Sequence, residues 1–215
     1  MDFDKIIKYG WRCQNAKYNH IENDGDYAIE REGDTAYLLF EWTDDKMDWK
    51  YNLDFPIKPY HDMGIKWRCH RGFLKAWKNV EPYVKGTILD STVKKIIIIG
   101  YSQGAAIATF AHEYVWFNRP DLRENGLEGY GFGSPQVYWG WRIKKSLQER
   151  WDSYHIIKNK SDIVTKVPPC IFGYRHIGNV IEIDSGARKP ILAHMWTEYV
   201  KGLNNCKNGE QKDDT

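Results

Sequence analysis

The stretch KKIIIIGYSQGAAIA, residues Lys94–Ala108, decides the fold. Its four consecutive isoleucines, Ile96–Ile99, put apolar β-branched side chains on both faces of an extended segment. That pattern is typical of a central parallel strand covered by helices on either side. The run ends at Gly100, and residues 100–104 fit G-x-S-x-G with Ser102 at the centre, followed by small residues that begin a helix. A strand that delivers a serine into a sharp strand-to-helix turn predicts a nucleophile elbow, beside which the helix N-terminus adds positive partial charge.

Strands and helices alternate through the later half of the chain, so we expect an α/β-hydrolase fold with a mostly parallel central sheet and helices on both faces. A chain of 215 residues suits one domain of this kind. We assign residues 1–203 to it and residues 204–215 to a polar C-terminal tail. The predicted helices are residues 2–15, 70–89, 105–118, 139–151 and 191–203, and the predicted strands are residues 27–31, 35–42, 96–99, 127–132, 154–158 and 180–183.

Composition excludes several classes of function. A net charge of +2 gives no electrostatic case for a nucleic-acid partner. The chain has no run of 18 apolar residues, and its beginning, MDFDKIIKYGW, lacks the apolar region of a secretory signal, so we expect a cytoplasmic protein. The four cysteines are scattered without metal-type spacing, and we expect no cofactor.

A serine hydroxyl needs a base within hydrogen-bond reach, and the base needs an acid to orient it. In α/β-hydrolases the acid and then the base follow the serine along the chain, each after a strand. Asp162 follows the predicted strand 154–158 in this way. Asp152 precedes that strand and Asp184 ends the last one, so both are less well placed. Asp162 is therefore the predicted acid. An aspartate that only stabilises a turn or caps a helix would occupy the same place in the sequence.

Two histidines lie downstream of Asp162. His176 precedes the last predicted strand, whereas His194 follows it at the mouth of the final helix, which is where the hydrolase layout places its base. We predict His194 as the base and a structural or pocket-lining role for His176.

Several stretches, in order over roughly residues 35–200, resemble the motifs of the class 3 (fungal-type) lipases. LLFEWT resembles the strand that ends in F-R-G-[ST], DWKYNLDF the N/D-W-x-x-D-L-x-F segment, and HRGFLKAW the H-x-G-F-x-x-A-[WY] motif. GYSQGAAIA stands where the family has G-H-S-L-G-G-A-L-A, and YGFGSPQVY is similar to T-[FY]-G-x-P-R-V. DIVTKVPP and GYRHIG resemble D-x-V-P-x-[LV]-P-P and G-[FY]-x-H-x-G.

The resemblance implies that Ser102 is the nucleophile, Asp162 the acid and His194 the base. It also implies that Thr43 supplies an oxyanion-hole donor beside the backbone N–H of Gln103. The sequence departs from the family pattern at Trp42, which replaces a glycine, and at Glu41, which replaces an arginine. Tyr101 and Gln103 replace the histidine and leucine of the elbow.

We therefore predict a lipase or esterase whose partner is a small-molecule ester or lipid. The segment Thr43–Phe55, which the resemblance makes a lid, alternates charged with aromatic or apolar residues and lacks a helical apolar stripe. This favours short- to medium-chain esters and at most weak association with a lipid surface. Two other readings stay open: a serine acyl hydrolase acting on a non-lipid substrate, such as a thioesterase or peptidase, and a catalytically silent binding protein of the same fold.

Overall fold

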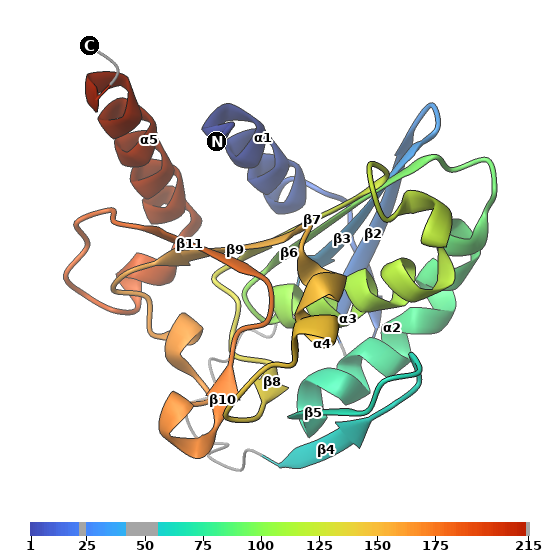
Figure 1. The fold of residues 1–215 in the computed structure, drawn as a ribbon. Coiled ribbons are helices and arrows are strands. Elements are labelled where there is room, and N and C mark those ends of the chain that lie inside the picture. Colours follow the sequence, from blue (N-terminus) through green and yellow to red (C-terminus); the bar gives the residue numbers. More distant parts are fainter. Residues whose placement is uncertain (22–24, 42–55, 214–215) are drawn as a thin grey trace.

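The computed structural model of the chain describes residues 1–21, 25–41 and 56–213. The strands of its central sheet are β1 Asn19–Ile21, β2 Gly25–Glu32, β3 Thr35–Glu41, β6 Lys95–Tyr101, β7 Leu127–Phe132, β9 Tyr154–Asn159 and β11 Asn179–Ile183. They lie in the order β1-β2-β3-β6-β7-β9-β11 (Figure 1). All neighbours from β3 to β11 pair in parallel, whereas β1, β2 and β3 pair antiparallel at one edge. The sheet is mainly parallel, as the sequence predicts.

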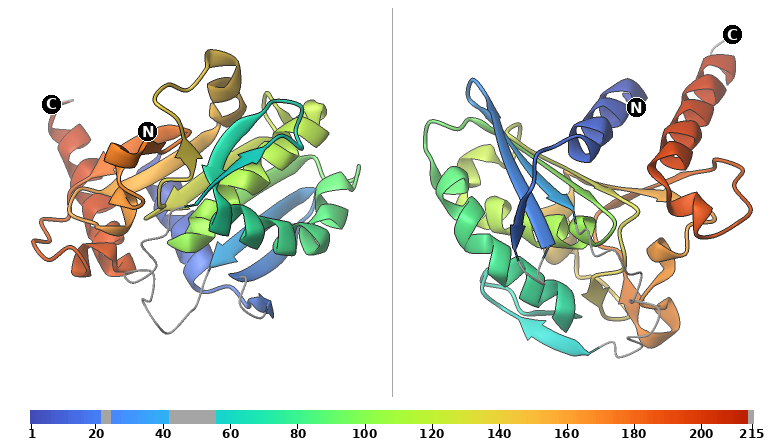
Figure 2. Two further views of the ribbon diagram at one scale, coloured as in Figure 1. Left: turned by 90° about the horizontal axis from the view of Figure 1, so that it is seen from below. Right: turned by 180° about the vertical axis from the view of Figure 1, so that it is seen from behind.

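Helices cover both faces of this sheet. Helices α1 Phe3–Gln14 and α5 Trp196–Asp213 lie on one face, and α2 Arg71–Leu89 and α3 Gln103–Asn118 lie on the other (Figures 1 and 2). The isoleucines of β6 divide between the two layers: Ile96 and Ile98 join the apolar cluster beneath α2 and α3, and Ile97 and Ile99 join the cluster beneath α1 and α5. Because successive side chains of a strand point to opposite faces, an unbroken apolar run is what a two-sided core requires.

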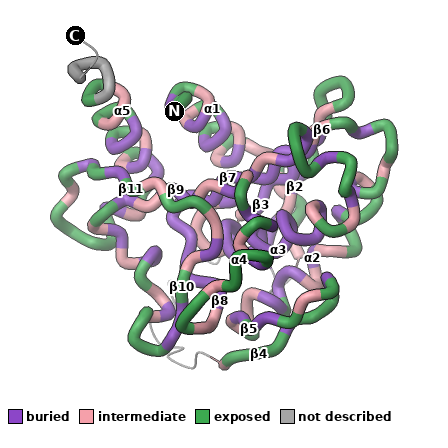
Figure 3. The backbone as a smooth tube through the Cα atoms, viewed as in Figure 1, coloured by how far each residue is buried: buried purple, intermediate pink, exposed green. Residues whose placement is uncertain are grey.

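Burial follows the same logic along the chain. The central strands and most of α3 are buried, whereas the outer helix faces and many of the loops are exposed (Figure 3). Small residues on α3, among them Ala105, Ala108 and Ala111, let the helix backbone lie close to the sheet. No helix within the described ranges combines the length and the apolar character that crossing a membrane requires.

A second, four-stranded sheet was not predicted from the sequence. Its strands are β4 Ile57–Tyr60, β5 Trp67–His70, β8 Tyr138–Trp139 and β10 Tyr174–Arg175, in the order β10-β8-β5-β4. It lies on the side of the central sheet that α2 and α3 cover (Figure 1). Strands of two to four residues are too short to show a period of two in the sequence.

Two helices differ from their predicted ranges. The predicted helix 139–151 is shortened to α4 Lys145–Gln148 with a 3-10 turn Glu149–Trp151, because Tyr138 and Trp139 pair in the small sheet. The final helix begins later, at Trp196, after a separate 3-10 turn Leu192–His194.

The final helix also ends later than predicted. It continues to Asp213, so residues 204–213 are helical and do not form a separate tail. Lys207 Nζ pairs with Asp4 of α1 at 2.7 Å, and Cys206 packs against the apolar cluster beneath α1, which holds the added turns to the domain. That the whole chain forms one domain remains a prediction.

Candidate active site

Ser102 lies on a strained turn between β6 and α3. Its φ of 55° is the only positive φ of a non-glycine residue in the described ranges. Such a conformation costs on the order of 1–3 kcal/mol and is typical of functional sites. The two flanking glycines are sterically required: a Cβ on Gly100 would lie 2.6 Å from Ala105 Cα, and a Cβ on Gly104 would overlap the Phe40 carbonyl oxygen. The turn therefore has the geometry of a nucleophile elbow.

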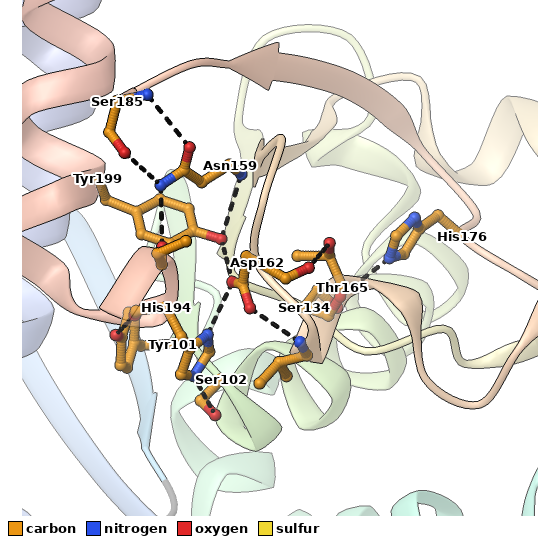
Figure 4. A network of polar contacts seen from close by, with 12 residues as sticks. Tyr101, Ser102, Ser134, Asn159, Asp162, Thr165, His176, Ser185, His194 and Tyr199 are labelled. Atoms are coloured by element: carbon orange, nitrogen blue, oxygen red, sulfur yellow. Dashed lines mark hydrogen bonds and ion pairs between the residues drawn. The ribbon is translucent and has the colours of Figure 1, made fainter. Parts of the chain in front are cut away.

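Asp162 and His194 meet Ser102 at the carboxyl ends of the parallel strands (Figure 4). Asp162 lies in the turn after β9, and His194 ends the 3-10 turn that follows β11. His194 Nε2 lies 2.9 Å from Ser102 Oγ, and His194 Nδ1 lies 2.7 Å from Asp162 Oδ2. An ionised carboxylate only accepts hydrogen bonds, so Nδ1 carries the proton and Nε2 is left to accept from the serine hydroxyl. The three residues predicted from the sequence thus form one hydrogen-bonded chain.

The Asp162 carboxylate is fully buried and well supplied with donors. Besides His194, it accepts hydrogen bonds from the Val164 N–H at 2.8 Å and from the Tyr199 hydroxyl at 2.6 Å. Donors of this kind compensate for the solvation that an ionised group loses on burial. The arrangement suits a fixed negative charge behind the imidazole.

A second layer of hydrogen bonds ties the strand ends together. The side-chain amide of Asn159 donates to the Ala193 carbonyl at 2.9 Å and to Ser185 Oγ at 3.0 Å. Its backbone N–H donates to Tyr199 Oη at 3.3 Å. Asn159, at the end of β9, therefore holds the segment that carries His194 next to the segment that carries Asp162.

The sequence prediction missed Asn159, Tyr199 and Gly133. Gly133, which follows β7, has a φ of 61°, and a Cβ there would lie 2.8 Å from His194 Cε1. Only the Gly133-Ser134-Pro135 turn was a visible signal for it. No sequence signal distinguishes Tyr199 from the other aromatic residues of a packed helix.

His176 lies apart from the triad. Its Nε2 donates to the Ser134 carbonyl at 2.9 Å, and burial lowers its pKa to about 4. The carboxylate of Asp184 is likewise used elsewhere, because it accepts the Gly186 N–H at 2.8 Å. The geometry thus favours His194 and Asp162 over these two alternatives.

Of the two predicted oxyanion-hole donors, Gln103 lies within the described residues and Thr43 lies outside them. Gln103 is the first residue of α3, directly after Ser102. The described part of the chain contains no group of three or more His, Cys, Asp or Glu residues arranged to hold a metal ion.

Known proteins of similar sequence include lipases. The chain is 30% identical over 145 residues to the secreted mono- and diacylglycerol lipase 1 of Fusarium solani, which covers 65% of this chain and 41% of that protein. It is 26% identical over 153 residues to a lipase of Rhizomucor miehei, which covers 67% of this chain and 40% of that protein. The chain thus spans about two fifths of the length of these curated relatives.

Similar solved structures give the same fold. The triacylglyceride lipase of Rhizomucor miehei superposes with a TM-score of 0.68 at 20% identity, over 84% of this chain and 80% of that one. A lipase of Rhizopus microsporus var. chinensis superposes with a TM-score of 0.66 at 25% identity, over 84% and 64% of the two chains. The predicted α/β-hydrolase fold is confirmed.

The relatives correct the predicted location. Two of them, from Fusarium solani and Malassezia globosa, are named secreted lipases. The expectation of a cytoplasmic protein is therefore wrong. That prediction depended on the composition of the first residues. The names of similar proteins are stronger evidence for the location than this composition.

The family itself is decided by a match along the chain. A model of the family described as Lipase (class 3) matches residues 37–172, which is more than half of the chain and includes Ser102 and Asp162. The chain belongs to the class 3 lipase family.

Proposed function

We propose that this protein is a serine carboxylic-ester hydrolase that cleaves acylglycerols or related esters. The observation that carries the proposal is the hydrogen-bonded chain Ser102–His194–Asp162 at the carboxyl ends of the parallel strands. The relatives named as lipases and as mono- and diacylglycerol lipases support an ester of this class as substrate.

In the proposed reaction, Ser102 Oγ attacks the ester carbonyl while its proton passes to His194 Nε2. The tetrahedral intermediate collapses, the C–O bond to the alcohol breaks, and His194 returns the proton to the departing alcohol oxygen. A water then attacks the acyl-enzyme with His194 again as base, which releases the acid and restores Ser102. Asp162 stabilises the imidazolium formed in each half and keeps the proton of the neutral ring on Nδ1.

An oxyanion hole is proposed at the start of α3. The Gln103 N–H belongs to the residue after the nucleophile, which donates one of the two hydrogen bonds in this fold. Family resemblance makes Thr43 the second donor. A described contact supports this: Phe40 and Glu41, at the end of β3, lie against Gly104, so the chain leaves β3 beside the N-terminus of α3. Donors already in place are what stabilises developing charge.

The two other readings make different predictions. A thioesterase or peptidase would use the same three residues on another acyl donor. A silent binding protein would keep the fold without turnover. The complete hydrogen-bond chain and the strained Ser102 favour an enzyme, and the names of the relatives favour an ester.

The proposal is tested with a fluorophosphonate probe and a chain-length series of glycerol esters, thioesters and amides, on the parent and on Ser102→Ala. We expect the parent to be labelled and to cleave esters fastest, and Ser102→Ala to lose both properties. An unlabelled, inactive parent would favour the binding protein, and a preference for thioesters or amides would favour the other hydrolases.

The same series addresses chain length. We propose a preference for short- to medium-chain esters with weak dependence on a lipid surface. The segment on which this depends, Thr43–Phe55, lies outside the described residues. The rate should level off as a short-chain triacylglycerol passes its solubility limit, whereas a steep rise at that point would indicate a lipase activated at the interface.

A further inference from the structure

The His194 imidazole lies in a slot between two elements. On one side the Tyr101 ring stacks on it, with 5.2 Å between ring centroids and 23° between planes. Gly133 lies close to the ring as well, and a Cβ there would lie 2.8 Å from Cε1 and 3.0 Å from Nδ1. An imidazole in contact with both has little room to turn about its side-chain bonds.

Tyr101 contacts the main chain of His194 as well as its ring. The Tyr101 hydroxyl donates a hydrogen bond to the His194 carbonyl (Figure 4). Tyr101 is the last residue of β6 and directly precedes Ser102. The residue next to the nucleophile therefore holds both the backbone and the ring of the base, although Ser102 and His194 lie 92 positions apart in the sequence.

Tyr199 acts on the other partner of His194. Its hydroxyl donates to Asp162 Oδ2, which is the same oxygen that His194 Nδ1 contacts. Tyr199 is fully buried, and burial together with the negative charge of Asp162 raises its pKa well above the ordinary tyrosine value. The hydroxyl thus keeps its proton and remains a donor at neutral pH.

We propose that Tyr101 and Tyr199 are positioning residues of the triad, with Tyr101 fixing the His194 ring and Tyr199 fixing the Asp162 carboxylate and sharing its charge. The inference rests on the proposed function. Neither tyrosine takes part in bond making. Each acts through a residue that does.

The two tyrosines have separable effects. Tyr101 keeps Nε2 aimed at Ser102, so its loss lowers the fraction of molecules with the productive geometry. Tyr199 withdraws charge from Asp162. Without this hydrogen bond, the Asp162 carboxylate stabilises protonated His194 more strongly. On the acid side of the pH profile, a larger fraction of the His194 rings is then already protonated and cannot accept the proton of Ser102. The groups that face this cluster are Ser102 and Tyr101 from the elbow, Asp162 after β9 and Tyr199 from α5, with Glu41 and Cys13 also close enough to act on Tyr101.

The variants Tyr199→Phe, Tyr101→Phe and Tyr101→Leu separate these effects. Tyr154→Phe is the matched control, because Tyr154 is also fully buried and its hydroxyl also donates a hydrogen bond, to the Ala105 carbonyl at 2.9 Å. The measurements are kcat, KM, the pH profile of kcat/KM, and the pH dependence of fluorophosphonate labelling.

For Tyr199→Phe we expect kcat to fall about tenfold or more with KM nearly unchanged, because a less firmly placed Asp162 leaves fewer molecules with the productive geometry. The acid limb of both pH profiles should move to higher pH. Tyr101→Leu should lower kcat about tenfold without moving the acid limb of the pH profile. Tyr101→Phe keeps the stacked ring, so its kcat should fall less than that of Tyr101→Leu. Tyr154→Phe should keep the parental kcat and profile.

The inference is overturned if Tyr199→Phe keeps the parental limb, or if Tyr154→Phe moves it as much. It is also overturned if Tyr101→Leu labels at the parental rate. The variant Ser102→Ala distinguishes a failure of this inference from a failure of the proposed function. Full ester cleavage by Ser102→Ala would overturn the proposed function. If Ser102→Ala is inactive but the Tyr101 and Tyr199 variants keep the parental kcat and pH profile, only the role of the tyrosines is overturned.

Discussion

Two histidines in this molecule contact a serine hydroxyl at nearly the same distance. His194 Nε2 lies 2.9 Å from Ser102 Oγ, and His112 Nε2 lies 3.1 Å from Ser153 Oγ. They differ at the other ring nitrogen. His194 Nδ1 contacts Asp162, whereas no carboxylate of the described chain lies within hydrogen-bond reach of His112 Nδ1. A serine beside a histidine is therefore weak evidence for a nucleophile unless an acid completes the chain.

The surroundings of the two pairs differ as well. Ser102 follows a parallel strand on a strained turn, whereas Ser153 precedes β9. His112 lies inside the buried helix α3, and burial lowers its pKa to about 3. A ring with that pKa stays neutral and is a weak base at neutral pH. The complete burial that makes His112 a good core residue makes it a poor base.

Two buried acids give the same contrast. Asp162 accepts from His194, whose other ring nitrogen lies within hydrogen-bond distance of the Ser102 hydroxyl. Glu113 accepts from Arg150 Nη1 at 2.7 Å and from Trp67 Nε1 at 3.0 Å. Burial raises the pKa of Glu113, and the opposing charge of Arg150 limits that rise. Because an arginine does not release its proton in proteins, the Glu113 pair can hold α3 in place but cannot pass a proton on.

Substitution of the two histidines should give the largest difference in kcat between the His194–Ser102 pair and the His112–Ser153 pair. We expect His194→Ala to lower kcat by several orders of magnitude, up to about 10⁶, because a triad acts as a unit and its losses do not add. His112→Ala should leave kcat per folded molecule within about threefold of the parent while lowering stability through the cavity it creates. His176→Ala should also retain turnover. Where His112→Ala does not fold, Ser153→Ala replaces it, and a loss of kcat comparable to that of His194→Ala in either variant would contradict the contrast.

The two acids give the next largest effect. Asp162→Asn should lower kcat by about 10⁴, because an amide no longer selects the productive tautomer of His194. Glu113→Gln should keep kcat but lower the free energy of unfolding by about 3–5 kcal/mol, because Arg150 would then be buried without a counter-charge. Steady-state kinetics and urea unfolding on both variants check this. A Glu113→Gln protein of parental stability but low kcat would place Glu113 with the catalytic group.

The sequence predicted the spatial arrangement of Ser102, Asp162 and His194 better than the structure around them, and the reason is physical. An isoleucine run closed by Gly-x-Ser-x-Gly defines strand, turn and helix locally, and parallel strands bring their carboxyl ends together, so Asp162 and His194 could be inferred from their places after later strands. Tyr199 could not be inferred, because a tyrosine on the buried face of a helix looks the same whether its hydroxyl is idle or bound to a carboxylate. Trp139 fitted a helical pattern but pairs with Tyr174 in the small sheet, a long-range contact that no local pattern encodes.

Residues beyond Leu203 were misjudged for a similar reason. Their polarity is typical of a tail, but the apolar contact of Cys206 and the pairing of Lys207 with Asp4 provide tertiary support for a helix that composition alone disfavours. The role predicted for Thr43 remains a prediction that no described contact of its own supports.

The smallest expected effect concerns stability and pH. His176 resembles His112 more than His194: burial lowers its pKa to about 4, compared with about 6.5 in an unfolded chain. Between these values the unfolded chain binds a proton that the folded protein excludes. The stabilisation from keeping His176 neutral is therefore complete above about pH 6.5 and is lost as the pH falls towards 4. For this one residue the loss between pH 7 and pH 5 amounts to about 1–2 kcal/mol.

His176→Gln isolates this contribution, because the glutamine amide can still donate to the Ser134 carbonyl but does not titrate. Urea unfolding of the parent at pH 7 and pH 5 should show a loss of stability that is smaller by about 1–2 kcal/mol in His176→Gln. His61→Gln, at an exposed position, should keep the parental dependence on pH. If His176→Gln retains the full pH dependence, His176 is not held neutral by burial. The contrast between a histidine held neutral by its surroundings and the one histidine placed to accept a proton from Ser102 would then rest on His112.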